Sequence, residues 1–261
     1  LLPSTLYFNS EEWNILPSNL RVRGKDIIID SLEAVNGDQR LYAYGKTSQY
    51  QTDTLTFGLD RFNLAAIAPI VGQQLGLRGI ATGNVEITSP IHSKGLLADI
   101  LCDSTFIAGE PLGTVTIGST WDEEFERFNI SARNINNGKK NLDAFARYTP
   151  KTRIIDAGIR LDSLNIKYAE PFLTDVFSGM SGYISGQINA EGPINMMEIS
   201  SNGTRLDDAV LRVGFTNVPY YADGAFHLDD TGVYFDKISI RDRYNGTGTV
   251  EGSINWSQFR D

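Results

Sequence analysis

Few residues of this 261-residue chain have the types and spacing that catalysis would need. Its two histidines lie far apart in sequence, His92 in an expected turn and His227 on an expected strand, and we interpret each as an exposed or edge residue and not as a general base or metal ligand. Acidic clusters such as 122–124 could supply an acid and a base or bind Ca²⁺, but they fall at expected turns and lack EF-hand spacing. No HExxH, CxxC, GxSxG or P-loop pattern is present. We therefore expect a protein that is not an enzyme, with no catalytic residue, metal site or cofactor.

The single cysteine, Cys102, lies in the segment LADILCDSTF. A reactive thiolate needs a basic, partly exposed setting, whereas Asp99 and Asp103 supply negative charge. We interpret Cys102 as a small buried apolar residue. A single cysteine permits no internal disulfide, which fits both the cytosol and a periplasmic protein without disulfides.

Charge and hydropathy exclude several partners. The net charge of −9 opposes nucleic-acid binding, which needs a concentrated basic face, and it opposes docking on anionic lipid. The sequence contains no run of about 18 apolar residues and no signal-peptide pattern. Because the chain opens on Leu-Leu-Pro without methionine, we expect it to be a piece of a longer protein.

A repeat organises the elements that would position any site. Leu59–Pro90 and Leu161–Pro193 share Leu-Asp, Asn and Pro at the same spacing, and after a one-residue insertion they share three glycines and a final proline. Glycine and proline restrict backbone geometry, so we expect the two stretches to have the same shape. Apolar residues at helical spacing predict two short helices, Pro69–Leu75 and Pro171–Phe177, at equivalent places on one sheet.

Strands are expected around these helices. Asn-Gly pairs between apolar runs, at Asn36-Gly37, Asn137-Gly138 and Asn245-Gly246, predict three hairpins. The order of hairpin, strand, helix and strands recurs with no composition break. The predicted organisation is a single elongated β domain over residues 1–261, with units at 21–122 and 123–222 and a partial third unit at 223–261.

Most expected strands alternate apolar and polar residues, which gives the sheet one apolar face. Two short helices cannot cover the apolar face of about 15 or more strands. The sheet must therefore close into a barrel, fold onto itself or curl into an open groove, and alternation alone does not choose between a packed sandwich and a groove. The residues predicted to line a groove are Leu55, Phe57, Leu59, Val85, Ile87, Val115, Ile117, Phe128, Ile130, Ile159, Leu161, Ile188, Phe226, Leu228, Val233, Phe235, Ile238 and Ile240.

The repeated pattern reads L-D-x-ϕ-N-ϕ, then P-ϕ-ϕ, then G-x-x-x-G-x-ϕ-x-ϕ and a final proline, where ϕ is apolar. It resembles the repeat unit of the TamB family, the translocation and assembly module within the AsmA-like group. The opening PSTLYFNSEEWNILPSNLRVRGKDIII and the ending GTVEGSINWSQFRD resemble the start and close of units in long homologues from Bacteroidetes. The resemblance covers essentially the whole chain, which would be an internal periplasmic fragment.

The resemblance implies a large envelope protein of a diderm bacterium, anchored in the inner membrane, whose periplasmic part is a curled sheet called a β-taco. Such proteins are implicated in moving phospholipid toward the outer membrane and in outer-membrane biogenesis. The expected function is therefore a periplasmic lipid-conduit segment whose groove takes phospholipid acyl chains. An outer-membrane barrel protein is a further candidate partner, and the inner membrane would be reached through parts of the parent chain outside this sequence.

Two alternatives remain open at this point. One is a scaffold that binds outer-membrane β-barrel proteins by strand augmentation. The other is a packed β-solenoid, a structural or adhesin domain with no ligand.

Overall fold

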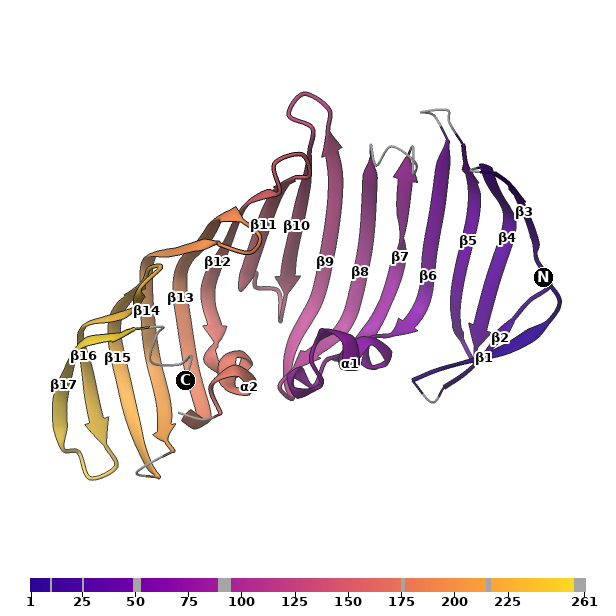
Figure 1. Cartoon of the computed structure of the whole chain (residues 1–261). Helices are drawn as coiled ribbons and strands as arrows, with labels where there is room; N and C mark the ends of the chain where they lie inside the picture. The colour runs from indigo at the N-terminus through magenta and orange to yellow at the C-terminus, as the bar shows by residue number, and fades with distance from the viewer. Residues whose placement is uncertain are drawn as a thin grey trace.

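The alternating segments of the sequence form one open antiparallel sheet of 17 strands in the computed structural model (Figure 1). The structure describes residues 1–9, 11–24, 26–48, 53–88, 95–174, 177–214 and 217–255. The predicted fold class, an elongated curled β-sheet of 15 or more strands with two short helices, is confirmed. Among these residues, no helix has the length and apolar character to cross a membrane.

The strands follow one another along the chain with short connections. Their bounds are β1 (Ser4–Phe8), β2 (Glu11–Ile15), β3 (Asn19–Arg23), β4 (Asp26–Asn36), β5 (Gln39–Thr47), β6 (Thr54–Asn63), β7 (Arg78–Thr88), β8 (Leu96–Ile107), β9 (Glu110–Asp122), β10 (Arg127–Ile135), β11 (Leu142–Thr149), β12 (Ile154–Asn165), β13 (Phe177–Pro193), β14 (Glu198–Val213), β15 (Val218–Leu228), β16 (Gly232–Asp242) and β17 (Thr247–Asn255).

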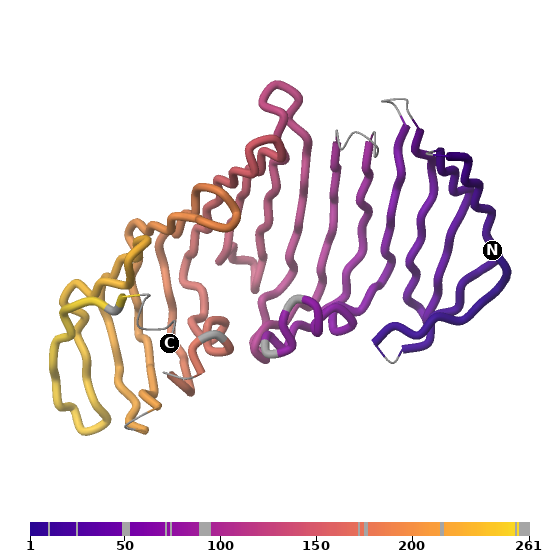
Figure 2. Tube along the Cα trace, in the orientation of Figure 1, coloured from indigo at the N-terminus to yellow at the C-terminus, as the bar shows by residue number. Residues whose placement is uncertain are grey.

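From β4 to β17, each strand pairs antiparallel with the next one in sequence. At the N-terminal edge, β2 and β3 both pair with β4, and β1 pairs with β2. The sheet is therefore a long meander with β1–β3 at one end and β17 at the other (Figure 2). Strands lie about 4.8 Å apart, so β4 to β17 extend over roughly 60 Å.

The three predicted hairpins are present, but the turns of the first and third are displaced. In the third, the Asn245 N–H donates to the Asp242 oxygen at 3.2 Å, so Arg243 and Tyr244 are the central residues and the prediction of Asn245-Gly246 is wrong. Asn137 and Gly138 both have positive φ, of 50° and 76°, as the central residues of a type I′ turn require. At the first hairpin, however, Asn36 still pairs with Gln39, so the central residues are Gly37 and Asp38. Gly37 has a φ of 60°, and hairpins with glycine at the first central position form readily. The prediction of Asn36-Gly37 as the turn is therefore wrong by one residue.

Two helical segments interrupt the meander and lie at the same end of the strands (Figure 1). The first helical segment, between β6 and β7, comprises 3₁₀ turns at Leu64–Ile67 and Gln73–Leu75 and α1 (Ala68–Val71). The second helical segment, between β12 and β13, comprises a 3₁₀ turn at Ile166–Ala169 and α2 (Glu170–Leu173).

Both helical segments begin before the predicted prolines. The side-chain oxygens of Asn63 and Asn165 accept hydrogen bonds from the backbone N–H groups two residues later, at 3.0 and 2.9 Å. This capping starts a 3₁₀ turn, and Pro69 and Pro171 follow inside the first α-helical turn. The predicted extension of the second helix to Phe177 is wrong, because the backbone of Phe177 pairs with β14 as the first residue of β13.

The strands before the two helical segments bulge in the same way. Arg61 and Ser163 have φ values of 53° and 50°, and the register of each strand shifts at that point. Their backbone N–H groups donate to Thr82 Oγ1 and Ser185 Oγ, both at 3.1 Å. The expectation that the two repeated stretches have the same shape is confirmed over the described residues. The unit boundaries remain predictions, and Pro90 and His92 lie outside the described residues.

Glycines allow the strands to approach closely beside these bulges. Gly83 and Gly186, shared by both repeats, have φ values of 157° and 129°. A Cβ atom at Gly83 would lie 2.1 Å from the backbone oxygen of Asp99 in β8. The shared glycines are therefore a packing requirement of the sheet.

Candidate functional site

Cross-strand register separates the sheet into two chemically different faces. We call the face that carries Leu59 the apolar face and the opposite one the polar face. Two continuous rows of paired residues cross the apolar face from β5 to β13. One consists of Leu41, Leu59, Gly83, Ile100, Ile117, Ala132, Ala144, Ile159 and Ile188, and the other of Ala43, Phe57, Val85, Ala98, Ser119, Ile130, Ala146, Ala157 and Ala190.

The adjacent row on the polar face has a different composition. It consists of Tyr42, Gly58, Asn84, Asp99, Gly118, Ser131, Phe145, Gly158 and Asn189. Ion pairs also lie on this face, including Arg147–Asp156 at 2.8 Å, with both side chains well exposed. The side chains of the polar face can therefore be hydrated by solvent. The two rows on the apolar face, by contrast, contain no charged residue.

All of the predicted lining residues lie on the apolar face. In β6 to β13, pairing links them to the two rows or to neighbouring positions, as in Leu55 opposite Ile87 and Leu142 opposite Leu161. Toward the C-terminus, Phe226 pairs with Phe235. The remaining pairs there are Leu228 with Val233, Ile240 with Ala222, and Ile238 with Val250. Their assignment as ligand-lining residues stays a prediction.

The apolar face is only partly covered. Leu55, Leu161 and Ile238 are buried, whereas Phe57, Ile130 and Ile159 are 42%, 36% and 39% exposed. The other predicted lining residues are half-buried. No second sheet packs on this face in the described part of the chain, because all 17 strands belong to one sheet. The apolar residues thus form an open surface between covered patches.

Each helical segment covers part of the apolar face. Below the second helical segment, Ile166 and Met180 pack in a buried cluster with Ala209, Ala222 and Ile238. The first helical segment contributes Leu64 and Ala66 to two smaller clusters. Each helical segment therefore covers the apolar face only locally.

An apolar recess of about 490 Å³ opens beside the first helical segment. Its volume is within the range typical of small-molecule sites, about 300–1,000 Å³. The residues that line it are Leu6, Phe8, Trp13, Ala34, Leu41, Leu59, Phe62, Leu64, Ile67, Ala81, Ile100, Cys102 and Ile117. Cys102 is 5% exposed, as predicted for a small core residue, and burial raises the pKa of its thiol, with Asp103 acting in the same direction.

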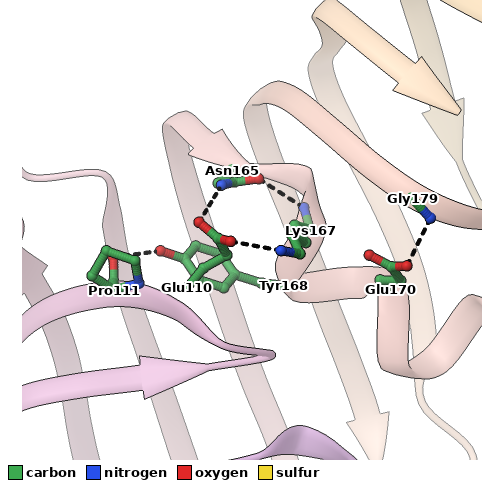
Figure 3. Close-up of polar contacts among 7 residues, drawn as sticks. All are labelled: Glu110, Pro111, Asn165, Lys167, Tyr168, Glu170 and Gly179. Atoms are coloured by element: carbon green, nitrogen blue, oxygen red, sulfur yellow. Dashed lines mark hydrogen bonds and ion pairs between the residues drawn. The ribbon is translucent and has the colours of Figure 1, made fainter.

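The turn between β8 and β9 connects the two helical segments. Its Ala108 N–H donates to the Leu75 oxygen of the first helical segment at 2.7 Å. Glu110 pairs with Lys167 of the second helical segment at 2.7 Å, and the Tyr168 hydroxyl donates to the Pro111 oxygen at 2.8 Å (Figure 3). The hydrogen bond that the Lys167 ammonium donates to the Glu110 carboxylate holds the pKa of Lys167 above its ordinary value.

The residues considered for chemistry remain separate. The Nδ1 atom of His227 lies 3.2 Å from Asp236 Oδ2, and the imidazole ring stacks on Tyr234. Both contacts are on the polar face of the sheet. Within the described ranges, no three or more His, Cys, Asp or Glu side chains are grouped to hold a metal ion.

Sequence reasoning predicted Leu59 and Ile117 as groove-lining residues but missed the other residues that enclose the recess. Trp13, Phe62 and Ala81 are at most 7% exposed, yet none was predicted to line a site. In β8, the alternation of Leu96, Ala98, Ile100 and Cys102 with polar or larger residues could have assigned these four side chains to one face of the sheet. Trp13 lies in a short N-terminal strand whose pairing is set only by tertiary contacts.

Comparison with protein-family models, with curated proteins and with solved structures finds no match to this chain. The similarity to the TamB family therefore rests on the sequence motifs alone, and membership of that family stays a prediction.

Proposed function

We propose that this chain is a segment of a lipid conduit, in which the apolar face carries phospholipid acyl chains. The observation that supports it is the pair of uncharged rows running without interruption across β5 to β13. At about 4.8 Å per strand, the eight intervals extend over roughly 38 Å. Because each strand presents uncharged residues in these rows, an acyl chain should bind with similar affinity anywhere along this path.

An acyl chain gains roughly 0.8 kcal/mol for each methylene that leaves water. Because this gain is non-directional, a chain can move from one strand to the next without breaking a specific bond. Such a conduit needs no catalytic group. The net charge of −9 discourages adhesion to anionic membrane surfaces, while the polar face keeps the sheet hydrated.

The resemblance supports the setting of this proposal. The conduit would lie in the periplasm of a diderm bacterium, within a larger protein anchored in the inner membrane. It would carry phospholipid between inner and outer membranes and contribute to outer-membrane biogenesis.

Photo-crosslinking tests the proposal with a matched pair of aromatic positions. A photoreactive phenylalanine analogue would replace Phe57 on the apolar face or Tyr44 on the polar face, which are 42% and 48% exposed. We expect phospholipid adducts at position 57 and not at position 44, detected by mass spectrometry after crosslinking in cells. Equal adduct yields at the two positions, or none at position 57, would contradict the conduit.

A second candidate is a scaffold that captures a strand of an outer-membrane barrel protein. It is favoured by the terminal strand β17, which pairs with β16 along Gly248–Val250 and neighbouring residues and has no second partner strand among the described residues. Crosslinks from β17 to a barrel protein, without lipid adducts at position 57, would support the scaffold over the conduit. Absence of both kinds of adduct would favour a structural domain without a ligand.

A further inference from the structure

The chain contains four Asn-Gly pairs, three at the predicted hairpins and a fourth, Asn202-Gly203, in β14. Such a pair can react with itself, because glycine has no side chain to shield its backbone nitrogen. That nitrogen loses its proton and forms a bond to the asparagine side-chain carbon, the bond from this carbon to the amide nitrogen breaks, and ammonia leaves. Water then opens the resulting cyclic succinimide to aspartate or isoaspartate. The reaction therefore needs an accessible glycine N–H and a backbone that can rotate.

Asn137 and Gly138, both exposed, are the least restrained of these pairs. Neither the Asn137 side chain nor the Gly138 N–H has a hydrogen-bond partner in the described part of the chain. The turn is closed by Asn136 and Lys139, whose backbone groups exchange hydrogen bonds of 2.8 and 3.0 Å. This bridge lies outside the continuous β10–β11 ladder. Local opening of the turn therefore breaks one bridge and leaves the ladder intact.

The charges beside this turn also favour the reaction. The attacking glycine nitrogen is an anion, and nearby cations stabilise an anion. Lys139 and Lys140 follow Gly138 directly, and both are exposed. Lys140 pairs with Asp143 at 2.5 Å, whereas Lys139 has no carboxylate partner among the described residues. Positive charge is thus available where the negative charge develops.

Each of the other three pairs is restrained by specific contacts. The Asn36 side-chain amide donates to Glu11 Oε2 at 3.2 Å, which places a carboxylate beside the reacting group. Asn202 lies inside β14, which is flanked by β13 and β15. The Gly246 N–H donates to Asp242 Oδ1 at 2.8 Å and is therefore not available to attack.

We propose that Asn137-Gly138 is a site of covalent modification by deamidation, at which Asn137 is converted to aspartate and isoaspartate. The modification does not depend on the function proposed for the apolar face. It places a new carboxylate beside Lys139 and Lys140. The isoaspartyl product also lengthens the backbone, so the short turn loses the hydrogen bonds between Asn136 and Lys139.

Peptide mapping of the full chain tests this assignment. The protein is incubated at mildly alkaline pH, and mass spectrometry follows deamidation at each of the four pairs. We expect Asn137 to react about tenfold faster than the other three asparagines, because each of those must first break a hydrogen bond or a strand ladder. An equal or faster rate at any other pair would overturn the assignment.

Two variants test the physical reason for this order. Asp242→Ala frees the Gly246 N–H, so the rate at Asn245 should rise about tenfold while the rate at Asn137 stays the same. Gly138→Ala adds a Cβ atom beside the attacking nitrogen and should slow the reaction at Asn137. An unchanged rate at Asn245 in the first variant, or at Asn137 in the second, would overturn the proposed control by the glycine N–H.

The structural effect of the modification is measured on the separated isoaspartyl form. Its Lys139 amide should exchange with deuterium faster than that of the unmodified protein, because the bond from Lys139 N–H to the Asn136 oxygen is lost. Equal exchange in the two forms would overturn the effect on the turn.

Discussion

The apolar face can be tested by placing the same charge on either side of one strand. Ile130 and Ser131 are neighbours in β10, so their side chains point to opposite faces. Ile130 pairs with Ser119 and Ala146 on the apolar face, and Ser131 pairs with Gly118 and Phe145 on the polar face. Ile130→Glu and Ser131→Glu each add one negative charge, and both original side chains are exposed.

The two variants should differ in lipid affinity, because the charge at position 130 prevents contact between the sheet and part of the acyl chain. If a glutamate at position 130 keeps about three methylenes of an acyl chain in water, the loss is about 2.4 kcal/mol, or roughly fiftyfold in affinity. Since both positions are exposed, each substitution should change the free energy of unfolding by less than about 1 kcal/mol.

The assay is titration with a fluorescent phospholipid, supported by quantitative mass spectrometry of lipid that remains bound through purification. Urea unfolding of both variants checks that the sheet is intact. Ile130→Glu should bind roughly fiftyfold more weakly than Ser131→Glu, which should match the wild type. Equal affinities of the two folded variants would refute the assignment of the apolar face as the lipid path.

Three further predictions concern the sheet and its helical segments. Gly113→Ala should reduce the free energy of unfolding in urea by more than twice the loss expected for Gly109→Ala, which is about 1–2 kcal/mol. Both glycines have positive φ, but only at Gly113 would a Cβ atom meet backbone, at 2.2 Å from a β10 oxygen. Equal losses in the two variants would contradict this prediction. Ile166→Ala should lower the free energy of unfolding by about 2–4 kcal/mol in the same assay, because removing a side chain that is only 4% exposed leaves a cavity under the second helical segment. A loss below about 1 kcal/mol would show that this segment does not stabilise the buried cluster. Because Glu110 raises the pKa of Lys167, the Lys167–Glu110 pair stabilises the folded state fully below the unfolded pKa of Lys167, near 10.4, and this stabilisation is lost as pH rises through the folded pKa. In Lys167→Met, the free energy of unfolding should not show this decrease at alkaline pH. Identical pH profiles for the variant and the wild type would contradict the prediction.

Strand periodicity made much of the apolar face predictable. Alternation has a period of two, so Phe57 and Ile87 could be assigned to one face without knowing which strands would pair. Shared glycines and prolines likewise predicted the equivalence of the two helical segments. Their starts were missed because capping by Asn63 and Asn165 produces a 3₁₀ turn, which lacks the 3.6-residue period used to find helices.

The recess could not be predicted in this way. Trp13 is in a five-residue strand and comes to lie beside Phe62 through pairing with β4 and contacts with the first helical segment. The register that joins β2 to Val35 and Ala34 is set by tertiary packing, and no local sequence pattern reports it. The displaced turn at Gly37 has a similar origin, because Asn-Gly marks a hairpin without fixing its register.

The β8–β9 turn has a consequence for how the molecule would unfold. In a meander, each strand contacts only its neighbours, so stability divides into local terms and an edge can fray without disturbing the middle. Contacts of Glu110 and Pro111 with Lys167 and Tyr168 join positions 57 residues apart across three intervening strands. Such a non-neighbour link makes the two repeats thermodynamically cooperative, so hydrogen exchange in β10 to β12 should report a shared opening event in place of progressive loss from the ends.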